Sequence, residues 1–130
     1  MAKIKRKAIP KAVRKAVYDR YGGRCGYCGC KITMAEMQVD HIEAIYLHES
    51  DSGGISALND ISNLMPACRM CNFYKSTYGV EKFRQQLKML PERLEKQFIY
   101  RLAKKYGLVN KTEEPIKFYF EKQKETEEND

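Results

Sequence analysis

The first helical pattern in the chain lies over residues 10–21. Val13, Val17 and Tyr21 recur every four residues, which places them on one face of a helix. Pro10 suits the start of this helix, and the pair Gly22-Gly23 suits its end. The sequence therefore predicts an amphipathic helix here, with one apolar face for a core.

Short segments in the middle of the chain favour strands. Residues 37–44 read Met-Gln-Val-Asp-His-Ile-Glu-Ala, and a second short strand over residues 63–66 is expected to stop at Pro66, which cannot donate a backbone hydrogen bond. Residues 116–120 alternate loosely and predict an edge strand. The stretch 50–54 is a loop by composition.

The second half of the chain is dominated by a longer helical pattern that starts at Val80. Its apolar residues recur three or four positions apart, and Pro91 is expected to kink or split the helix. The apolar positions are predicted to pack in a core: Phe83, Leu87, Leu90, Leu94, Phe98 and Leu102. With the short strands, these helices predict an α+β fold.

Composition limits the class of protein. The 130 residues are 43% hydrophobic, which suits one compact domain with extensions. No apolar run approaches the roughly 18 residues of a membrane span, and the basic start at residues 1–7 lacks the apolar run of a secretion signal. We therefore expect a cytoplasmic protein with reduced thiols and no membrane partner.

The charge is uneven along the chain. The net charge of +7 divides into +9 over residues 1–31, −4 over residues 32–79 and +2 over residues 80–130. A basic region beside an acidic one is typical of a protein that binds phosphates and gathers carboxylates around a cation. Solvated lysine-rich helices that bind nothing would give the same count.

Four of the five cysteines form two pairs with the same spacing, Cys25-Gly-Tyr-Cys28 and Cys68-Arg-Met-Cys71. Two such pairs in an intracellular protein predict a tetrahedral zinc site, and four thiolates leave no open position, so this zinc would be structural. A redox dithiol is the alternative, although one pair would be enough for it. Cys30 is left over as a packing residue or a free thiol, or as a replacement for Cys28.

The remaining candidate chemistry lies between the cysteine pairs and directly after the second pair. Val39-Asp40-His41-Ile42 lies between the pairs, and the run from Asn63 to Lys75, Asn-Leu-Met-Pro-Ala-Cys-Arg-Met-Cys-Asn-Phe-Tyr-Lys, includes the second pair and continues past it. In this combination of motifs, over roughly residues 20–80, the sequence resembles the HNH endonuclease family. The resemblance implies a small ββα-metal nuclease core with a four-cysteine zinc site, flanked by helices.

The resemblance also implies roles for individual residues. His41 matches the general base that activates water, and Asp40 matches a ligand of a catalytic Mg²⁺ or Mn²⁺. Asn63 matches the asparagine that fixes the hairpin loop and orients the base; an ordinary turn residue or a helix cap are its alternatives. Asn72 stands where many members have histidine as second cation ligand, and it could instead be a residue that tolerates a left-handed backbone.

Neighbouring residues on a flat strand point to opposite faces, so Asp40 and His41 can serve one phosphate only if the strand twists strongly or ends there. The expected reaction is hydrolysis of a DNA phosphodiester that leaves 5′-phosphate and 3′-hydroxyl ends. Lys75 is a candidate phosphate contact or a solvated helix lysine. The other candidates for contact with the DNA backbone are Lys5, Arg6, Lys7, Lys11, Arg14 and Lys15.

The sequence thus predicts three segments: a flexible basic arm at 1–8, a nuclease domain with flanking helices at 9–110, and an extension at 111–130 with an acidic, disordered end. Two other functions remain open. A zinc-stabilised nucleic-acid-binding module without catalysis would explain the charge and the cysteines, and a protein adaptor would use residues 80–105 for docking. Cleavage of both DNA strands would need two active sites, from a homodimer or a protein partner.

Overall fold

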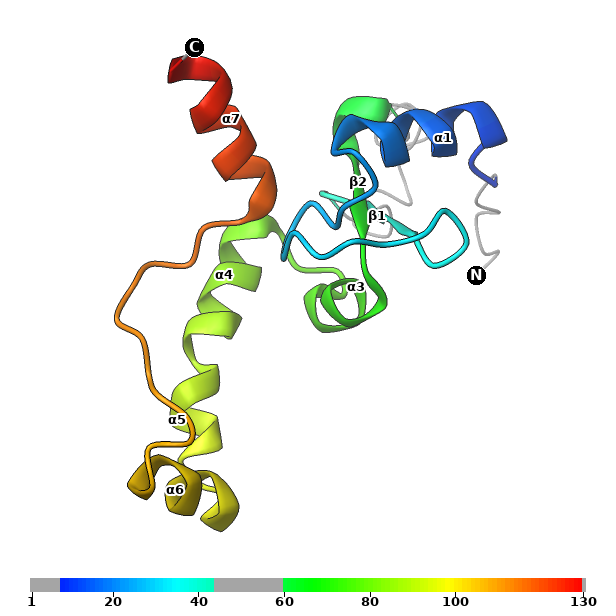
Figure 1. The fold of residues 1–130 in the computed structure, drawn as a ribbon. Helices are drawn as coiled ribbons and strands as arrows, with labels where there is room; N and C mark the ends of the chain where they lie inside the picture. Colours follow the sequence, from blue (N-terminus) through cyan, green and yellow to red (C-terminus); the bar gives the residue numbers. More distant parts are fainter. Residues whose placement is uncertain (1–7, 44–59, 130) are drawn as a thin grey trace. The chain divides into compact units, whose positions relative to one another are not determined.

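The computed structural model describes residues 8–43 and 60–129 (Figure 1). The basic arm with Lys5, Arg6 and Lys7, and the loop expected at 50–54, lie outside the described residues. The chain divides into two compact units, Met1–Gly79 with Phe118–Asp130 (unit 1) and Val80–Lys117 (unit 2). The domain boundaries expected from the sequence stay a prediction.

Unit 1 begins with helix α1, Lys11–Arg20, which confirms the first helical pattern. Pro10 precedes the helix as its N-cap, and Gly22 and Gly23 follow it with φ of 62° and 78°. Such positive φ angles suit glycine, which has no Cβ to clash with the backbone. Val17 on the apolar face is completely buried.

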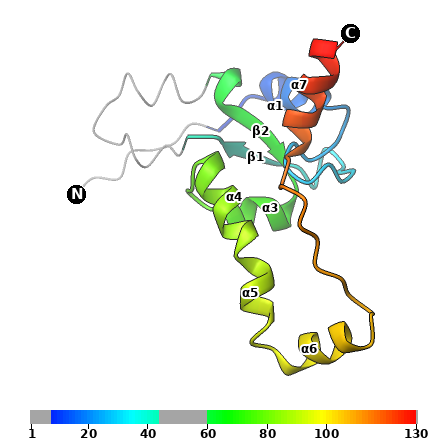
Figure 2. The ribbon, with the colours of Figure 1, turned by 90° about the vertical axis from the view of Figure 1, so that its left-hand side faces the viewer.

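The sheet of unit 1 is an antiparallel pair of short strands, β1 (Gln38–His41) and β2 (Leu64–Ala67) (Figure 2). Asp40 is paired with Met65, and His41 with Leu64. The 3-10 turn η2 (Ile61–Asn63) precedes β2. Pro66 is the third residue of β2 rather than its end, so the strand lies one residue further along the chain than predicted.

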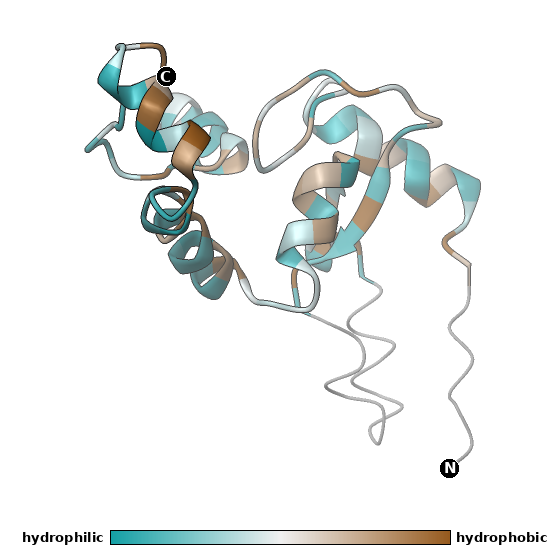
Figure 3. Cartoon of the chain, turned by 90° about the horizontal axis from the view of Figure 1, so that it is seen from below, coloured by the Kyte–Doolittle hydropathy of each residue, from teal (hydrophilic) through white to brown (hydrophobic). Residues whose placement is uncertain are grey.

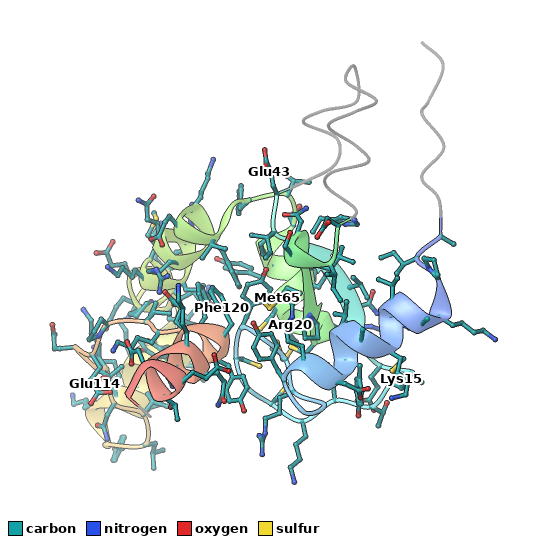
Figure 4. The ribbon with its side chains drawn as sticks, turned by 90° about the horizontal axis from the view of Figure 1, so that it is seen from above. Lys15, Arg20, Glu43, Met65, Glu114 and Phe120 are labelled. Carbon is teal, nitrogen blue, oxygen red and sulfur yellow. The ribbon has the colours of Figure 1, made fainter. Side chains whose placement is uncertain are left out.

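The hydrophobic core of unit 1 lies between α1 and this hairpin. It is built from the buried residues Val17, Ile32, Met37 and Leu64. Arg20 ties the end of α1 to the hairpin, because its guanidinium donates to the backbone oxygens of Leu64 at 3.2 Å and Ile61 at 3.1 Å (Figure 4). A core this small is typical of a domain that needs additional cross-links.

The end of the chain differs from its prediction. The edge strand expected at 116–120 is wrong, because helix α7 occupies Tyr119–Asn129. Residues 118–120 instead cover the first cysteine turn: the backbone N–H groups of Tyr119 and Phe120 donate to the backbone oxygens of Tyr27 and Gly26 at 2.9 and 2.8 Å. Disorder was expected for the acidic end from its composition, and the structure places α7 there.

Unit 2 consists of α4 (Val80–Lys88), α5 (Leu90–Leu94) and α6 (Phe98–Lys105), followed by an extended segment. The predicted split at Pro91 is confirmed, since this proline lies in the first turn of α5. The segment returns along α4, where the Arg84 guanidinium donates to the backbone oxygen of Ile116 at 2.5 Å.

The core predicted for this region is only partly correct. Phe83 is buried, but Leu94, Phe98 and Leu102 are 43%, 66% and 40% exposed. Figure 3 marks the hydrophobic positions of these helices. The spacing of the apolar residues identified the amphipathic helix correctly, but an apolar face on a short helix does not by itself show that a partner covers it.

Candidate functional site

The two cysteine turns of unit 1 bring four sulfur atoms together. The Sγ atoms of Cys25, Cys28, Cys68 and Cys71 all lie within 4.8 Å of one another. Cys28 Sγ and Cys68 Sγ, forty residues apart in the chain, are separated by 3.8 Å. The pairing of the two turns predicted from their spacing is therefore present in the fold.

Backbone N–H groups within the two turns donate to two of these sulfurs and so stabilise negative charge on them. The N–H groups of Tyr27 and Cys28 donate to Cys25 Sγ at 3.4 and 3.5 Å, and the N–H of Cys71 donates to Cys68 Sγ at 3.4 Å. Gly29, at φ 81°, closes the first turn. Cys68 is at the same time the N-cap of α3 (Arg69–Lys75), so one sulfur both caps a helix and enters the cluster.

Within the cluster, the thiols of Cys25 and Cys71 are joined by a hydrogen bond. A hydrogen bond from Cys71 lowers the pKa of Cys25 to about 4, and the same contact raises the pKa of Cys71. Four thiols this close therefore favour a state in which a cation replaces their protons.

The geometry fits zinc. A tetrahedral site with Zn–S distances of about 2.3 Å separates its sulfurs by about 3.8 Å, and Cys28 and Cys68 are already at that separation. Cys30 does not belong to the four-sulfur group. It is exposed, and its backbone oxygen accepts the N–H of Cys25 at 2.8 Å.

Asp40 lies near the end of β1 and is buried, with 5% of its surface exposed. Its Oδ2 accepts two hydrogen bonds, from Tyr27 Oη at 2.5 Å and from Lys75 Nζ at 2.9 Å. Burial raises the pKa of Asp40, and these two donors oppose that rise. The carboxylate is thus held inside the protein by a phenol and an ammonium.

The second oxygen of Asp40 is left for other ligands. Among the described residues, Oδ1 takes part in no hydrogen bond, and no buried side-chain oxygen or nitrogen there lacks a partner. It follows that Oδ1 keeps some contact with solvent. A hard anionic oxygen in that position suits Mg²⁺ or Mn²⁺.

The prediction for Lys75 needs correction. The sequence placed it among the residues that contact DNA or lie in solvent, but its side chain is 0% exposed. Its ammonium donates to Asp40 Oδ2 and, at 3.2 Å, to the backbone oxygen of His41. A buried, paired ammonium cannot reach a phosphate, so Lys75 belongs to the interior of the site.

His41 is the last residue of β1 and is half-buried. The strand ends there, which is one of the two conditions under which Asp40 and His41 can serve the same phosphate. Beyond it, Asn63 fixes the chain: its Oδ1 accepts the N–H of Glu43 at 2.9 Å, and its Nδ2 donates to the Glu43 backbone oxygen at 3.1 Å.

Asn63 therefore holds the segment that follows His41. Its own backbone oxygen accepts the N–H of Ile42 at 2.9 Å, which adds a third bond between the same segments. Asn63 is the last residue of η2, so it does not cap that turn; the N-cap is Asp60, whose carboxylate accepts the N–H of Ser62. The helix-cap alternative for Asn63 is thereby removed.

Asn72 lies in the middle of α3, with helical hydrogen bonds on both sides, so its backbone is not left-handed. Residues three apart share one helix face, and Lys75 on that face reaches Asp40. Helix α3 also packs against β1. Within the described part of the chain the Asn72 side chain makes no hydrogen bond, so its amide oxygen remains available to a ligand.

The basic residues of α1 do not behave alike. Lys11 and Lys15 are exposed, and Lys15 forms an exposed ion pair with Asp19 at 2.5 Å (Figure 4). Arg14 instead donates from one nitrogen to the backbone oxygens of Met34 and Met37, at 2.8 and 2.6 Å. Arg14 therefore supports the fold around the hairpin, and Lys11 has the most freedom to meet a phosphate.

Tyr27 is the site residue that the sequence analysis missed. It lies between the first two cysteines and is 2% exposed. Its aromatic ring packs edge-on against Phe118 and Phe120, with centroid distances of 5.4 and 6.2 Å. Its position inside the cysteine turn was visible in the sequence, but its contact with Asp40 depends on tertiary packing.

Strands β1 and β2 and helix α3 thus form a ββα unit closed by a four-cysteine cluster. The family model of the HNH endonucleases matches residues 25–77, which contain all of these elements and all four cysteines. Over these residues the chain is similar to the HNH endonuclease family. No curated protein and no solved structure matches the chain. None of the helices in the described residues is long and apolar enough to cross a membrane.

Proposed function

We propose that this protein is a metal-dependent DNA endonuclease, in which His41 is the general base and Asp40 and Asn72 hold the catalytic cation. The supporting observation is the arrangement at the end of β1. A buried carboxylate with one free oxygen lies beside a half-buried imidazole, and Asn63 fixes the backbone directly after it.

Each residue of the chain has a separate task in this reaction. His41 accepts a proton from water as the water attacks phosphorus, a role that suits an imidazole near neutral pH. Asn63 holds the segment after His41 through its bonds to Glu43. Asp40 Oδ1 and the Asn72 amide oxygen supply hard oxygen ligands. When bound, the cation stabilises the negative charge that develops on the scissile phosphate and the leaving oxygen.

The four-cysteine cluster is proposed to hold one structural zinc, because four thiolates complete a tetrahedral site. The zinc joins the turn before β1 to the start of α3 and so keeps Asp40 and Asn72 on neighbouring elements. Exposed lysines such as Lys11 are proposed to contact the DNA backbone. These contacts carry no sequence information, so sequence preference is expected to be weak.

A nicking assay on supercoiled plasmid tests this function. With Mg²⁺ or Mn²⁺ the protein should convert supercoiled plasmid to open circles, and excess chelator should stop the reaction. DNA ligase should reseal the nicks, because it requires a 5′-phosphate next to a 3′-hydroxyl. DNA binding in a gel shift without cleavage in either metal would favour the zinc-stabilised binding module instead.

A further inference from the structure

We propose that Tyr27 and Lys75 are positioning residues, which fix the Asp40 carboxylate so that its Oδ1 is presented to the catalytic cation. This inference rests on the proposed function. It gives the two cysteine turns a second role besides holding zinc, which is to place the donors that contact Asp40. Tyr27 lies in the first cysteine turn, and Lys75 lies at the end of the helix that follows the second. Both side chains donate to the same oxygen, Asp40 Oδ2.

The first donor comes from the turn Cys25–Cys28. Tyr27 lies inside this turn, and its hydroxyl donates to Asp40 Oδ2 at 2.5 Å. The aromatic ring of Tyr27 is held in place by edge-on contacts with Phe118 and Phe120. The backbone oxygen of Tyr27 also accepts the N–H of Tyr119 at 2.9 Å. The hydroxyl therefore has little freedom to leave the carboxylate.

The second donor comes from the turn Cys68–Cys71. Helix α3 starts from Cys68, and Lys75 is its last residue, four positions after Cys71. The buried ammonium of Lys75 contacts both Asp40 Oδ2 and the backbone oxygen of His41. One side chain thus joins the proposed cation ligand to the backbone of the proposed base.

The consequence concerns the orientation of the carboxylate. Two donors on Oδ2 resist rotation about the Cβ–Cγ bond and leave Oδ1 as the oxygen for a cation. The Asp40–Lys75 pair carries no net charge, so cation binding depends on orientation rather than on excess negative charge. Partners that orient a metal ligand are worth about 10–100-fold in metal affinity or activity when they are removed.

The substitution Tyr27→Phe removes one donor and keeps the ring that packs against Phe118 and Phe120. Tyr18→Phe is the matched control, because it removes a hydroxyl that donates at 2.9 Å to the backbone oxygen of Ile32, away from Asp40. Three quantities are measured for the parent and both variants: zinc content, Mn²⁺ binding by electron paramagnetic resonance, and nicking rate as a function of Mn²⁺ concentration.

We expect both variants to retain zinc and to unfold at similar temperatures. Tyr27→Phe should bind Mn²⁺ about 10-fold or more weakly than Tyr18→Phe, and its nicking should require correspondingly more Mn²⁺. Equal Mn²⁺ binding and equal nicking by the two variants would overturn the positioning role while leaving the proposed function intact. A parent protein that neither binds Mn²⁺ nor cleaves DNA would overturn both proposals.

A second measurement needs no variant. In the parent protein labelled with ¹³C-tyrosine, addition of Mg²⁺ should shift the Cζ resonance of Tyr27, because its hydrogen-bond partner becomes a cation ligand. The Cζ resonance of Tyr18 should stay in place. A Tyr27 resonance that does not respond to saturating Mg²⁺ would contradict the positioning role, whatever the stability of the Tyr27→Phe protein.

Discussion

The Lys75 ammonium lies 2.9 Å from Asp40 Oδ2, with side chains that are 0% and 5% exposed. Two charges this deeply buried are tolerated only as a pair, because either one alone would be a buried charge without an opposite charge beside it. Since Lys75 also bonds to the His41 backbone, the pair links the stability of the hairpin to the geometry of the site.

The pair leads to a prediction about stability. Lys75→Met should lower the free energy of unfolding by about 3–5 kcal/mol, because it leaves the buried Asp40 carboxylate without the ammonium group that pairs with it. The double variant Lys75→Met with Asp40→Asn should recover part of that loss, since no buried charge remains. Chemical denaturation of the zinc-loaded proteins measures both values.

The exposed pair Lys15–Asp19 provides the control for this prediction. Both of its side chains are more than half exposed, so Lys15→Met should change stability very little. A Lys75→Met protein as stable as Lys15→Met would show that the buried pair does not stabilise the fold.

A second prediction concerns zinc. Elemental analysis should find about one zinc per chain, and Cys68→Ala should lose it, because Cys68 is both a cluster sulfur and the N-cap of α3. The variant should lose cooperative unfolding, since structural zinc contributes about 10–16 kcal/mol of binding free energy. Cys30→Ser should keep the metal and the fold; zinc loss in that variant would place Cys30 among the ligands.

A third prediction concerns Asn63. Asn63→Ala removes both side-chain bonds to Glu43 and frees the segment that follows His41. A displacement of about 1 Å at a reacting group lowers activity by about 100-fold, and we expect a nicking rate reduced on that scale with zinc retained. Asn110→Ala, at an exposed position in unit 2, is the control and should cleave like the parent. Full activity of Asn63→Ala would assign Asn63 to the turn alone.

A fourth prediction separates two basic residues of α1. Lys11→Ala should weaken DNA binding and reduce the slope of log K against log salt by about 0.9, the value for one phosphate contact. Arg14→Ala should mainly destabilise the protein, because Arg14 donates to the backbone oxygens of Met34 and Met37. Fluorescence anisotropy at several salt concentrations and thermal melts distinguish the two effects. The assignment is contradicted if Lys11→Ala leaves the slope unchanged.

The local features of the fold could be predicted from the sequence. The spacing of Val13 and Val17, the glycines after α1 and the two cysteine turns depend on neighbouring residues only, and the structure confirms them. The patterns of helices and short strands predicted the α+β class, and the resemblance to the HNH family led to the ββα unit. These features rest on short-range geometry or on a motif with fixed spacing.

The errors lie where tertiary contacts decide. Residues 116–120 alternate like a strand, but Phe118 packs against Tyr27, and α7 follows. The spacing that placed Phe98 in a core describes a helix face, and it does not say whether anything covers that face. Lys75 looked like a surface lysine because its carboxylate partner lies thirty-five residues away in the chain. No local pattern could have shown that pair.

The central claim is that His41 activates the water that cleaves DNA, and a comparison of the parent with His41→Ala tests it most directly. Both proteins are first shown to hold equal zinc and to bind DNA equally in a gel shift. Their single-turnover nicking rates are then measured at saturating Mn²⁺. Loss of a general base lowers the rate by about 100–10,000-fold, and we predict a decrease in that range for His41→Ala. Equal rates for the two proteins would contradict the account.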